Sequence, residues 1–275
     1  MRGRRSHGGA SAVGVVATAS AQFSAWRASQ LATDLGATLE GLWVLDPALT
    51  DNTIVSNKFS IANDFSGNAR HATQGAAGDR PADSGDINGH ACALFSAGTV
   101  EWLALPGLGS LGDNRTFFAL SKLTSTAPAV IYTVLTLQDG TDTDVTVWYK
   151  LKAGLGTDYN AQAMRTHATT SAACRRAELP ALSTDVQMDI LTHTGTDPTT
   201  GYTFRAAGAD QTSAFADSID CTPAYAATPG AIGATASVPE RGFGGAIAFV
   251  GVMSSVATPA QVAAIEAYSL AVWGT

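Results

Sequence analysis

Short segments in which apolar and polar residues alternate constrain the fold of this chain more than any other feature. DVTVWYKL (144–151) alternates strictly, so its apolar residues are expected to face a core while Asp144 and Trp148 face solvent. VQMDILTH (186–193) repeats the alternation and places Asp189 on the outer face. TFFALSKL and AVIYTVLT are nearly continuous in apolar residues, which is typical of strands covered on both faces. A period of two residues predicts β-strands throughout the middle of the chain.

Turn-forming residues separate these segments at the spacing of an antiparallel sandwich. They lie at 112–114 (GDN), 139–140 (DG), 196–198 (TDP) and 200–201 (TG). The composition agrees, because charged residues make up only 14% of the chain and glycines number 28, which favours strands and turns over helices with charged faces. We therefore predict an all-β fold, a two-sheet antiparallel sandwich.

Charge, hydropathy and cysteine content exclude several classes of protein. The formal net charge of −7 argues against broad nucleic-acid binding, because a protein that neutralises many phosphates needs a basic surface. No run of about 18 apolar residues is present, so no membrane span is expected. Cys92, Cys174 and Cys221 are too few and too far apart for a disulfide framework or a zinc site. We expect free, buried thiols, which suit assembly in a reducing cytoplasm.

The first 22 residues, MRGRRSHGGASAVGVVATASAQ, allow two interpretations. Arg2, Arg4 and Arg5 precede a small-residue apolar stretch that ends in Ala-Ser-Ala, which is the layout of a secretory signal. Against this, the apolar stretch contains no Leu or Phe. The alternative is a terminal arm that is held by an assembly partner.

Each end of the chain also carries a helical pattern. Phe23, Trp26, Leu31 and Leu35 recur at helical spacing before Gly36, which predicts a short helix that docks either on its own domain or on a partner. We accordingly divide the chain into an arm and helix for anchoring (1–36) and a β domain (37–275). TPAQVAAIEAYSLAVWGT predicts a C-terminal helix that starts in a capping box at Thr258.

From Gly41 onward the chain resembles the laminin-G-like, concanavalin A-like jelly-roll domains of bacterial surface proteins and phage virion proteins. The resemblance is carried, in order, by GLWVLDP, DFSGNARHATQ leading to DRP, INGHACALFSAGTVEWLAL and FGGAIAFVGVMSSVATPAQVAAIEAYSLAVWG. The chain departs from the family at Phe249, where many relatives have a glutamate, and the central strands match by pattern only. The resemblance implies a jelly-roll sandwich with carbohydrate-binding relatives.

The stretch DFSGNARHATQ (64–74) is predicted to be a structural corner. Gly67 and Asn68 supply the backbone freedom of a tight turn between two strands, and the resemblance implies the same. His71 is expected to be a hydrogen-bonded scaffold residue, because no second ligand stands near it at metal-binding spacing.

The sequence lacks the parts of common catalytic sites. Relatives that cut polysaccharides carry the acid cluster Glu-x-Asp-x-x-Glu, whereas this chain offers only Asp142 and Asp144. Neither a Gly-x-Ser-x-Gly elbow nor a phosphate-binding loop occurs. We therefore expect no enzyme and no cofactor or metal; a calcium ion at the two aspartates is the alternative to a solvated turn, but it would need six or more oxygen ligands.

A glycan site is expected at the strand 144–151 and the loop before it, where jelly-roll relatives hold sugars. Trp148 offers a flat apolar face beside the carboxylates of Asp142 and Asp144. Trp102 and Tyr202 also bear aromatic rings at strand positions, although such rings usually lie in the core of a sandwich.

Two function classes follow. The first is a non-enzymatic virion structural protein (a spike, fibre or decoration subunit) that assembles in the host cytoplasm and displays a domain for host-surface glycan. Its homo-oligomer and its contacts with other virion proteins would use Arg2, Arg4, Arg5, Phe23, Trp26 and Leu31. The second is a secreted bacterial carbohydrate-binding or carbohydrate-cleaving module. The N-terminus of the native chain separates them, because a start at Met1 favours assembly and a start near Gln22 favours secretion.

Overall fold

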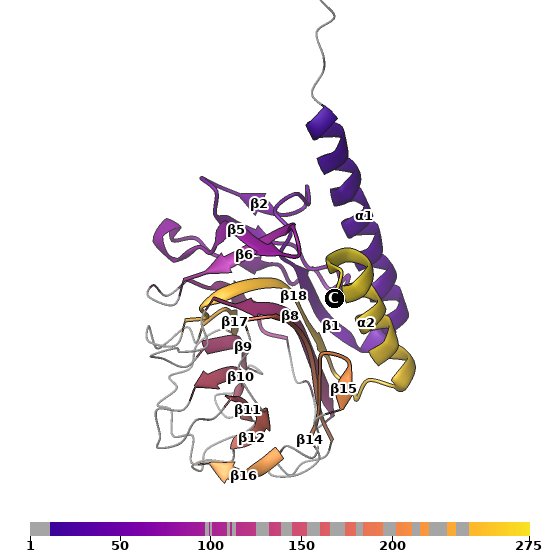
Figure 1. Cartoon of the computed structure of the whole chain (residues 1–275), viewed down its shortest axis with the longest axis vertical. Coiled ribbons are helices and arrows are strands. Elements are labelled where there is room, and N and C mark those ends of the chain that lie inside the picture. Colours follow the sequence, from indigo (N-terminus) through magenta and orange to yellow (C-terminus); the bar gives the residue numbers. More distant parts are fainter. Residues whose placement is uncertain are drawn as a thin grey trace, which may run out of the picture.

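The fold is described by a computed structural model, in which two antiparallel β-sheets face each other and two helices cover one of them (Figure 1). The all-β prediction is confirmed. The structure describes residues 12–96, 99, 101–108, 111, 114–124, 132–138, 145–152, 160–165, 174–179, 184–194, 202–210, 215–219, 230–234 and 242–275.

The first sheet has the strand order β15-β14-β13-β8-β18-β6-β5, and β1 pairs with β18 beside this path. Its strands are β1 (Leu39–Val44), β5 (Ala82–Ile87), β6 (His90–Phe95), β8 (Arg115–Leu123), β13 (Val186–His193), β14 (Tyr202–Ala206), β15 (Ala209–Asp210) and β18 (Gly245–Met253). The sequence segments TFFALSKL and VQMDILTH correspond to β8 and β13. Both strands are covered on both faces, so Asp189 is buried, contrary to the exposure that simple alternation predicts.

The second sheet has the order β16-β12-β11-β10-β9-β17-β7-β4-β3-β2. Its strands are β2 (Thr53–Ile54), β3 (Phe59–Ala62), β4 (Ala72–Thr73), β7 (Leu103–Leu105), β9 (Tyr132–Gln138), β10 (Val145–Lys152), β11 (Asn160–Arg165), β12 (Cys174–Leu179), β16 (Phe215–Ile219) and β17 (Gly230–Ile232). The segment 145–151 (VTVWYKL) lies in β10, so the predicted strand is present there. The short 3₁₀ turns η1 (Gly36–Thr38) and η2 (Ala77–Asp79) precede β1 and β5.

Two hydrophobic cores lie on opposite faces of the first sheet. The inner core fills the space between the sheets and includes Trp43, Phe95, Phe117 and Val250. The outer core lies under the helices α1 (Ala12–Leu35) and α2 (Pro259–Trp273). Its members include Leu31, Phe118, Phe249, Ile265 and Trp273.

The helix α2 begins and ends as the sequence predicts. The Thr258 side chain accepts from the Gln261 backbone N–H, and the Gln261 side chain accepts from the Thr258 backbone N–H, which completes the capping box. Gly274 ends the helix in the left-handed conformation. The buried Ile265, Tyr268 and Val272 form the stripe that faces the sheet.

The helix α1 starts earlier than predicted and splits its apolar residues between two faces. Leu31 and Leu35 are buried in the outer core, whereas Phe23 and Trp26 are 45% and 56% exposed. The helix therefore docks on its own domain through one face and leaves an aromatic pair in solvent on another. None of the described helices is both long and apolar enough to cross a membrane.

Cys92 lies in the outer core as a free thiol, which agrees with the prediction for that cysteine. Burial raises the pKa of its thiol to about 12, so the reactive thiolate is scarce at neutral pH. The backbone of Cys174 begins β12, and Cys221 lies outside the described residues.

Candidate functional site

The corner at residues 64–71 uses its polar groups to hold the backbone. The Asp64 carboxylate accepts from the backbone N–H groups of Leu42, Ser66 and Arg70 at 2.9–3.0 Å. Gly67 has φ +89°, a left-handed conformation that favours glycine. His71 Nδ1 accepts from the Asp64 backbone N–H at 3.2 Å. These contacts explain the polar stretch as a scaffold between β3 and β4.

The glycan site expected from the sequence is only partly within the described chain. Asp142 and Asp144 lie outside the described residues, so the calcium alternative also stays a prediction. The backbone of Trp148 pairs with Leu135 of β9, a buried residue of the inner core, but the Trp148 side chain is not described. The exposure of Trp148 and its contact with sugar therefore stay predictions.

Some of the residues expected to mediate assembly also lie outside the described residues. Arg2, Arg4 and Arg5 lie outside the described residues. Phe23 and Trp26 are exposed, and Leu31 is buried against the sandwich. Of the other two aromatic residues weighed for sugar contact, Trp102 is half-buried and the side chain of Tyr202 is not described.

A groove runs along the side of α2, between this helix and the strands β13 to β15. It contains two hollows of about 610 Å³ and about 460 Å³, and Glu266 lines both. We call the first the C-terminal hollow and the second the N-terminal hollow, after the ends of α2 that line them. On α2 the groove residues recur at three- and four-residue steps, which places them on one side of the helix: Pro259, Val262, Ala263, Glu266, Ala267 and Leu270.

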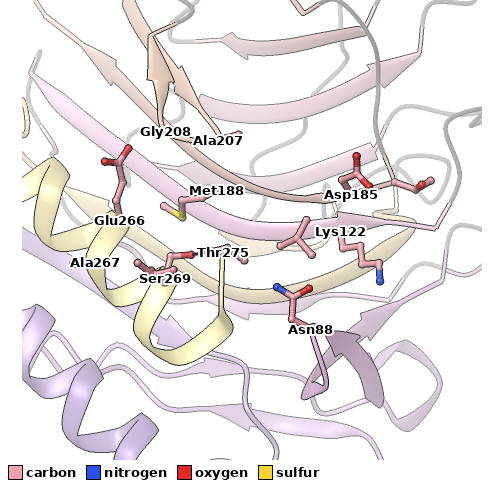
Figure 2. Close-up of a pocket in the computed structure, with 13 residues that line it drawn as sticks. Asn88, Lys122, Asp185, Met188, Ala207, Gly208, Glu266, Ala267, Ser269 and Thr275 are labelled. Atoms are coloured by element: carbon pink, nitrogen blue, oxygen red, sulfur yellow. Dashed lines mark hydrogen bonds between the residues drawn. The ribbon is translucent and has the colours of Figure 1, made fainter.

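The C-terminal hollow combines an apolar floor with polar groups at its rim. Met188 of β13 lies between Glu266 on one side and Asp185 and Lys122 on the other (Figure 2). Asn88, from the turn between β5 and β6, reaches the hollow from below in this view. The wall is completed by Thr184, Val186, Ala207, Gly208, Ala267, Ser269, Leu270 and Thr275.

Hydrogen bonds fix this rim. The Asn88 side chain donates to the backbone carbonyls of Trp273 at 2.8 Å and Gly274 at 3.3 Å, and so ties the β5–β6 turn to the end of α2. The hydroxyls of Ser269 and Thr275 are 2.5 Å apart. At the other end of α2, the Gln261 side-chain amide donates to the Leu35 carbonyl at 2.9 Å. The helix that forms one wall is thus fastened at both ends.

The two hollows meet at the ion pair between Arg205 of β14 and Glu266. Arg205 Nε and Nη2 donate to the two carboxylate oxygens of Glu266 at 2.5 and 3.3 Å. The hydrogen bond to Glu266 is the main cause of the raised pKa of Arg205. Beyond it, the N-terminal hollow is lined by threonine hydroxyls, those of Thr192, Thr194 and Thr203, and by Asp210.

The groove offers planar charged groups, hydroxyls and apolar patches over a continuous length, which is the surface chemistry that a sugar chain requires. Among the described residues no cluster of three or more His, Cys, Asp or Glu side chains is arranged to hold a metal ion. Sequence patterns missed this site, because Lys122, Asp185, Arg205 and Glu266 come from four separate elements. The α2 residues that line the groove form a second stripe beside the buried one. This spacing in the sequence is the signal from which one wall of the groove is predictable.

Comparison with known proteins adds information at the level of the fold. No protein-family model matches the chain, and no curated sequence matches it. The Trypanosoma rangeli sialidase solved in complex with sialic acid is 10% identical, covers 86% of this chain with a TM-score of 0.51, and is matched over 36% of its own length. This chain thus spans about a third of that enzyme. The similarity agrees with the β-sandwich fold.

Two further structures are more distant. Domain 4 of AbnA, a GH43 extracellular arabinanase from Geobacillus stearothermophilus solved with arabinotriose, is 13% identical, with a TM-score of 0.48 over 83% of this chain and 98% of that domain. The CBM40 of the Ruminococcus gnavus IT-sialidase, bound to α2,3-sialyllactose, is 16% identical, with a TM-score of 0.37 over 57% of this chain and 83% of that one.

Proposed function

We propose that the chain is an extracellular carbohydrate-binding β-sandwich module that holds its ligand in the groove along α2. The observation that carries the proposal is the groove itself, in which the Arg205–Glu266 ion pair and Lys122 stand beside the apolar floor at Met188. Sugar rings present hydroxyls on their edges and C–H groups on their faces, so such a mixed surface complements them.

The shared fold gives secondary support. The sialidase that resembles this chain was solved with sialic acid, a sugar, in the same structure. A virion role rests on the sequence resemblance alone, and the structures compared above give it no support. We therefore favour the secreted module over the spike, fibre or decoration subunit.

Binding without cleavage is the chemistry that we propose. Glycoside hydrolysis needs a protonated carboxylic acid beside a second carboxylate. Both carboxylate oxygens of Glu266 accept hydrogen bonds from Arg205, an arrangement that suits holding a ligand rather than donating a proton. The groove has a single further acid at each end, Asp185 and Asp210.

The proposal is tested by titrating sialylated, arabinan-derived and bacterial-surface oligosaccharides against the full chain by calorimetry. For the ligand that binds, Glu266→Gln and Lys122→Ala are expected to weaken affinity by roughly tenfold each, because each removes a charged hydrogen-bonding group. Lys58→Ala is the matched control, since Lys58 pairs with Glu101 away from the groove. Failure of every glycan to bind refutes the function.

The same titration decides between the two candidate positions on the molecule. If Trp148→Ala abolishes binding while the groove variants bind normally, the ligand lies at β10 and the groove assignment is wrong. New reducing ends after prolonged incubation with the bound glycan would contradict binding without cleavage.

A further inference from the structure

The helix α1 presents an aromatic pair to solvent on the side that does not pack on the sandwich. The ring centroids of Phe23 and Trp26 are 6.0 Å apart. The guanidinium carbon of Arg27 lies 5.8 and 5.5 Å from the two centroids, within cation–π range of both rings. Large exposed aromatic residues that form a cluster mark interaction surfaces more often than isolated ones do.

The same helix extends beyond its own domain. Its first turns project past α2 and past both sheets (Figure 1). From Ala12 to Trp26 the helix contains no charged residue, and Gly14, Thr18 and three valines are poor helix formers. An isolated helix of this length and composition is marginal in water. A helical conformation here therefore calls for a packing partner along this face.

The spacing of the apolar residues suits a partner helix. Phe23 and Trp26 continue toward the N-terminus at three- and four-residue steps to Ala19 and Val16, which is the spacing of a coiled-coil seam. This seam differs from the buried one, which includes Ala28, Leu31 and Leu35. The helix thus packs on its own sandwich through one side, and on the other side Phe23 and Trp26 are exposed.

Charge favours a second copy of this chain as the partner. Residues 1–11 carry three arginines and no acid, so the remaining residues hold 13 basic against 23 acidic side chains, a formal charge of −10. In a chain that keeps residues 1–11, the basic arm of one copy is complementary to the acidic body of another. Val16, Ala19, Phe23 and Trp26 are uncharged, and the guanidinium of Arg27 lies beside the two rings.

We propose that the chain self-associates through the outer face of α1, with Phe23 and Trp26 at the centre of the interface. This inference is independent of glycan binding. It also gives the exposed aromatic pair a function that the groove along α2 does not use.

The test is sedimentation of the full chain from micromolar to millimolar concentration. We expect a concentration-dependent species of twice the monomer mass. The double variant Phe23→Ser/Trp26→Ser is expected to raise the dimer Kd by about a hundredfold or more, since buried aromatic residues dominate such interfaces. Both side chains are exposed in the monomer, so circular dichroism should show an intact fold. Val55→Ser, which removes another exposed apolar residue, is the matched control.

A second variant probes the charge argument. Replacing Arg2, Arg4 and Arg5 together by glutamate should raise the dimer Kd at low salt. The difference in Kd from the native chain should shrink as the salt concentration rises. A chain that stays monomeric at all concentrations overturns the proposal. So does a dimer that is unchanged in the aromatic double variant. A monomer that binds phosphatidylglycerol vesicles through Phe23 and Trp26 would assign the face to a lipid surface instead.

Discussion

The inner and outer cores share the first sheet but are built differently. The inner core comes from strands of both sheets, and the buried Asp189 and His193 lie on the same face of β13 as its member Leu191. In the second sheet, the buried Thr133 hydroxyl of β9 lacks a hydrogen-bond partner among the described residues. The outer core includes the hydroxyls of Ser24 and Tyr268 and the indole N–H of Trp273, buried without a hydrogen bond of ordinary geometry among the described residues. A buried polar group without a good hydrogen bond costs free energy. We therefore expect the helical layer to be less stable than the sandwich. The comparison predicts that the protein opens first under its helices.

Removing α1 should give the largest effect. Deletion of residues 1–36 exposes the outer core and removes Ala28, Leu31 and Leu35, so we expect a loss of about 5 kcal/mol or more in the free energy of unfolding. Urea denaturation measures the loss. Deletion of residues 1–20 is the control, because the packing on the sandwich described here starts at Ala21. Equal stability of the two truncated proteins would show that the outer core is dispensable.

Two adjacent residues of β8 face opposite cores, so substituting each allows the two cores to be compared. Phe117 lies in the inner core and Phe118 in the outer core, and either substitution by alanine should cost about 3–5 kcal/mol. Of these two residues, Phe118 contacts Phe249 edge to face, with ring centroids 6.3 Å apart. A double-mutant cycle with Phe249→Ala should therefore give a coupling of about 1 kcal/mol for Phe118 and a smaller one for Phe117. Equal couplings would mean that the cores are not independent.

The buried Tyr268 hydroxyl lies near Trp273 and Ser24 but makes no hydrogen bond of ordinary geometry with the described residues, so its removal should not weaken the outer core. Tyr268→Phe keeps the ring that contacts Phe249 at 5.1 Å and deletes the buried oxygen, so we expect a change between zero and about 1 kcal/mol of added stability. The melting temperature gives the sign. A loss of more than about 1 kcal/mol would indicate that the hydroxyl has a bound water as partner.

The loop after β1 should give the smallest effect, and one that depends on pH. Burial raises the pKa of Asp46 above its ordinary value, so the folded protein keeps a proton that the unfolded chain releases. Stability therefore falls as pH rises from the unfolded pKa through the folded one, and the cost is complete at neutral pH. Asp46→Asn should add about 0.5 kcal/mol at pH 7 and nothing at pH 3, measured by urea denaturation. A greater gain at pH 3 would refute this assignment.

The sequence predicted the sandwich because its strands are long enough for alternation and apolar runs to show, as in β8 and β10. It also predicted α2 from Thr258, Gln261 and Gly274, whose local chemistry defines a helix boundary. It missed the exposure of Phe23 and the burial of Asp189, since both depend on which neighbours cover a face. The groove was missed for the same reason, because Arg205 and Glu266 meet only after the sheet and α2 are assembled.

The position of β18 sets the order in which this protein can fold. This strand, which is buried throughout, pairs with β1, β6 and β8, all of which precede it by more than about 120 residues. During synthesis these three strands leave the ribosome before β18 does. Until β18 is made, the edge of each that pairs with β18 has no partner strand. Such distant pairing predicts slow folding and a long period in which the unpaired edges are prone to aggregate.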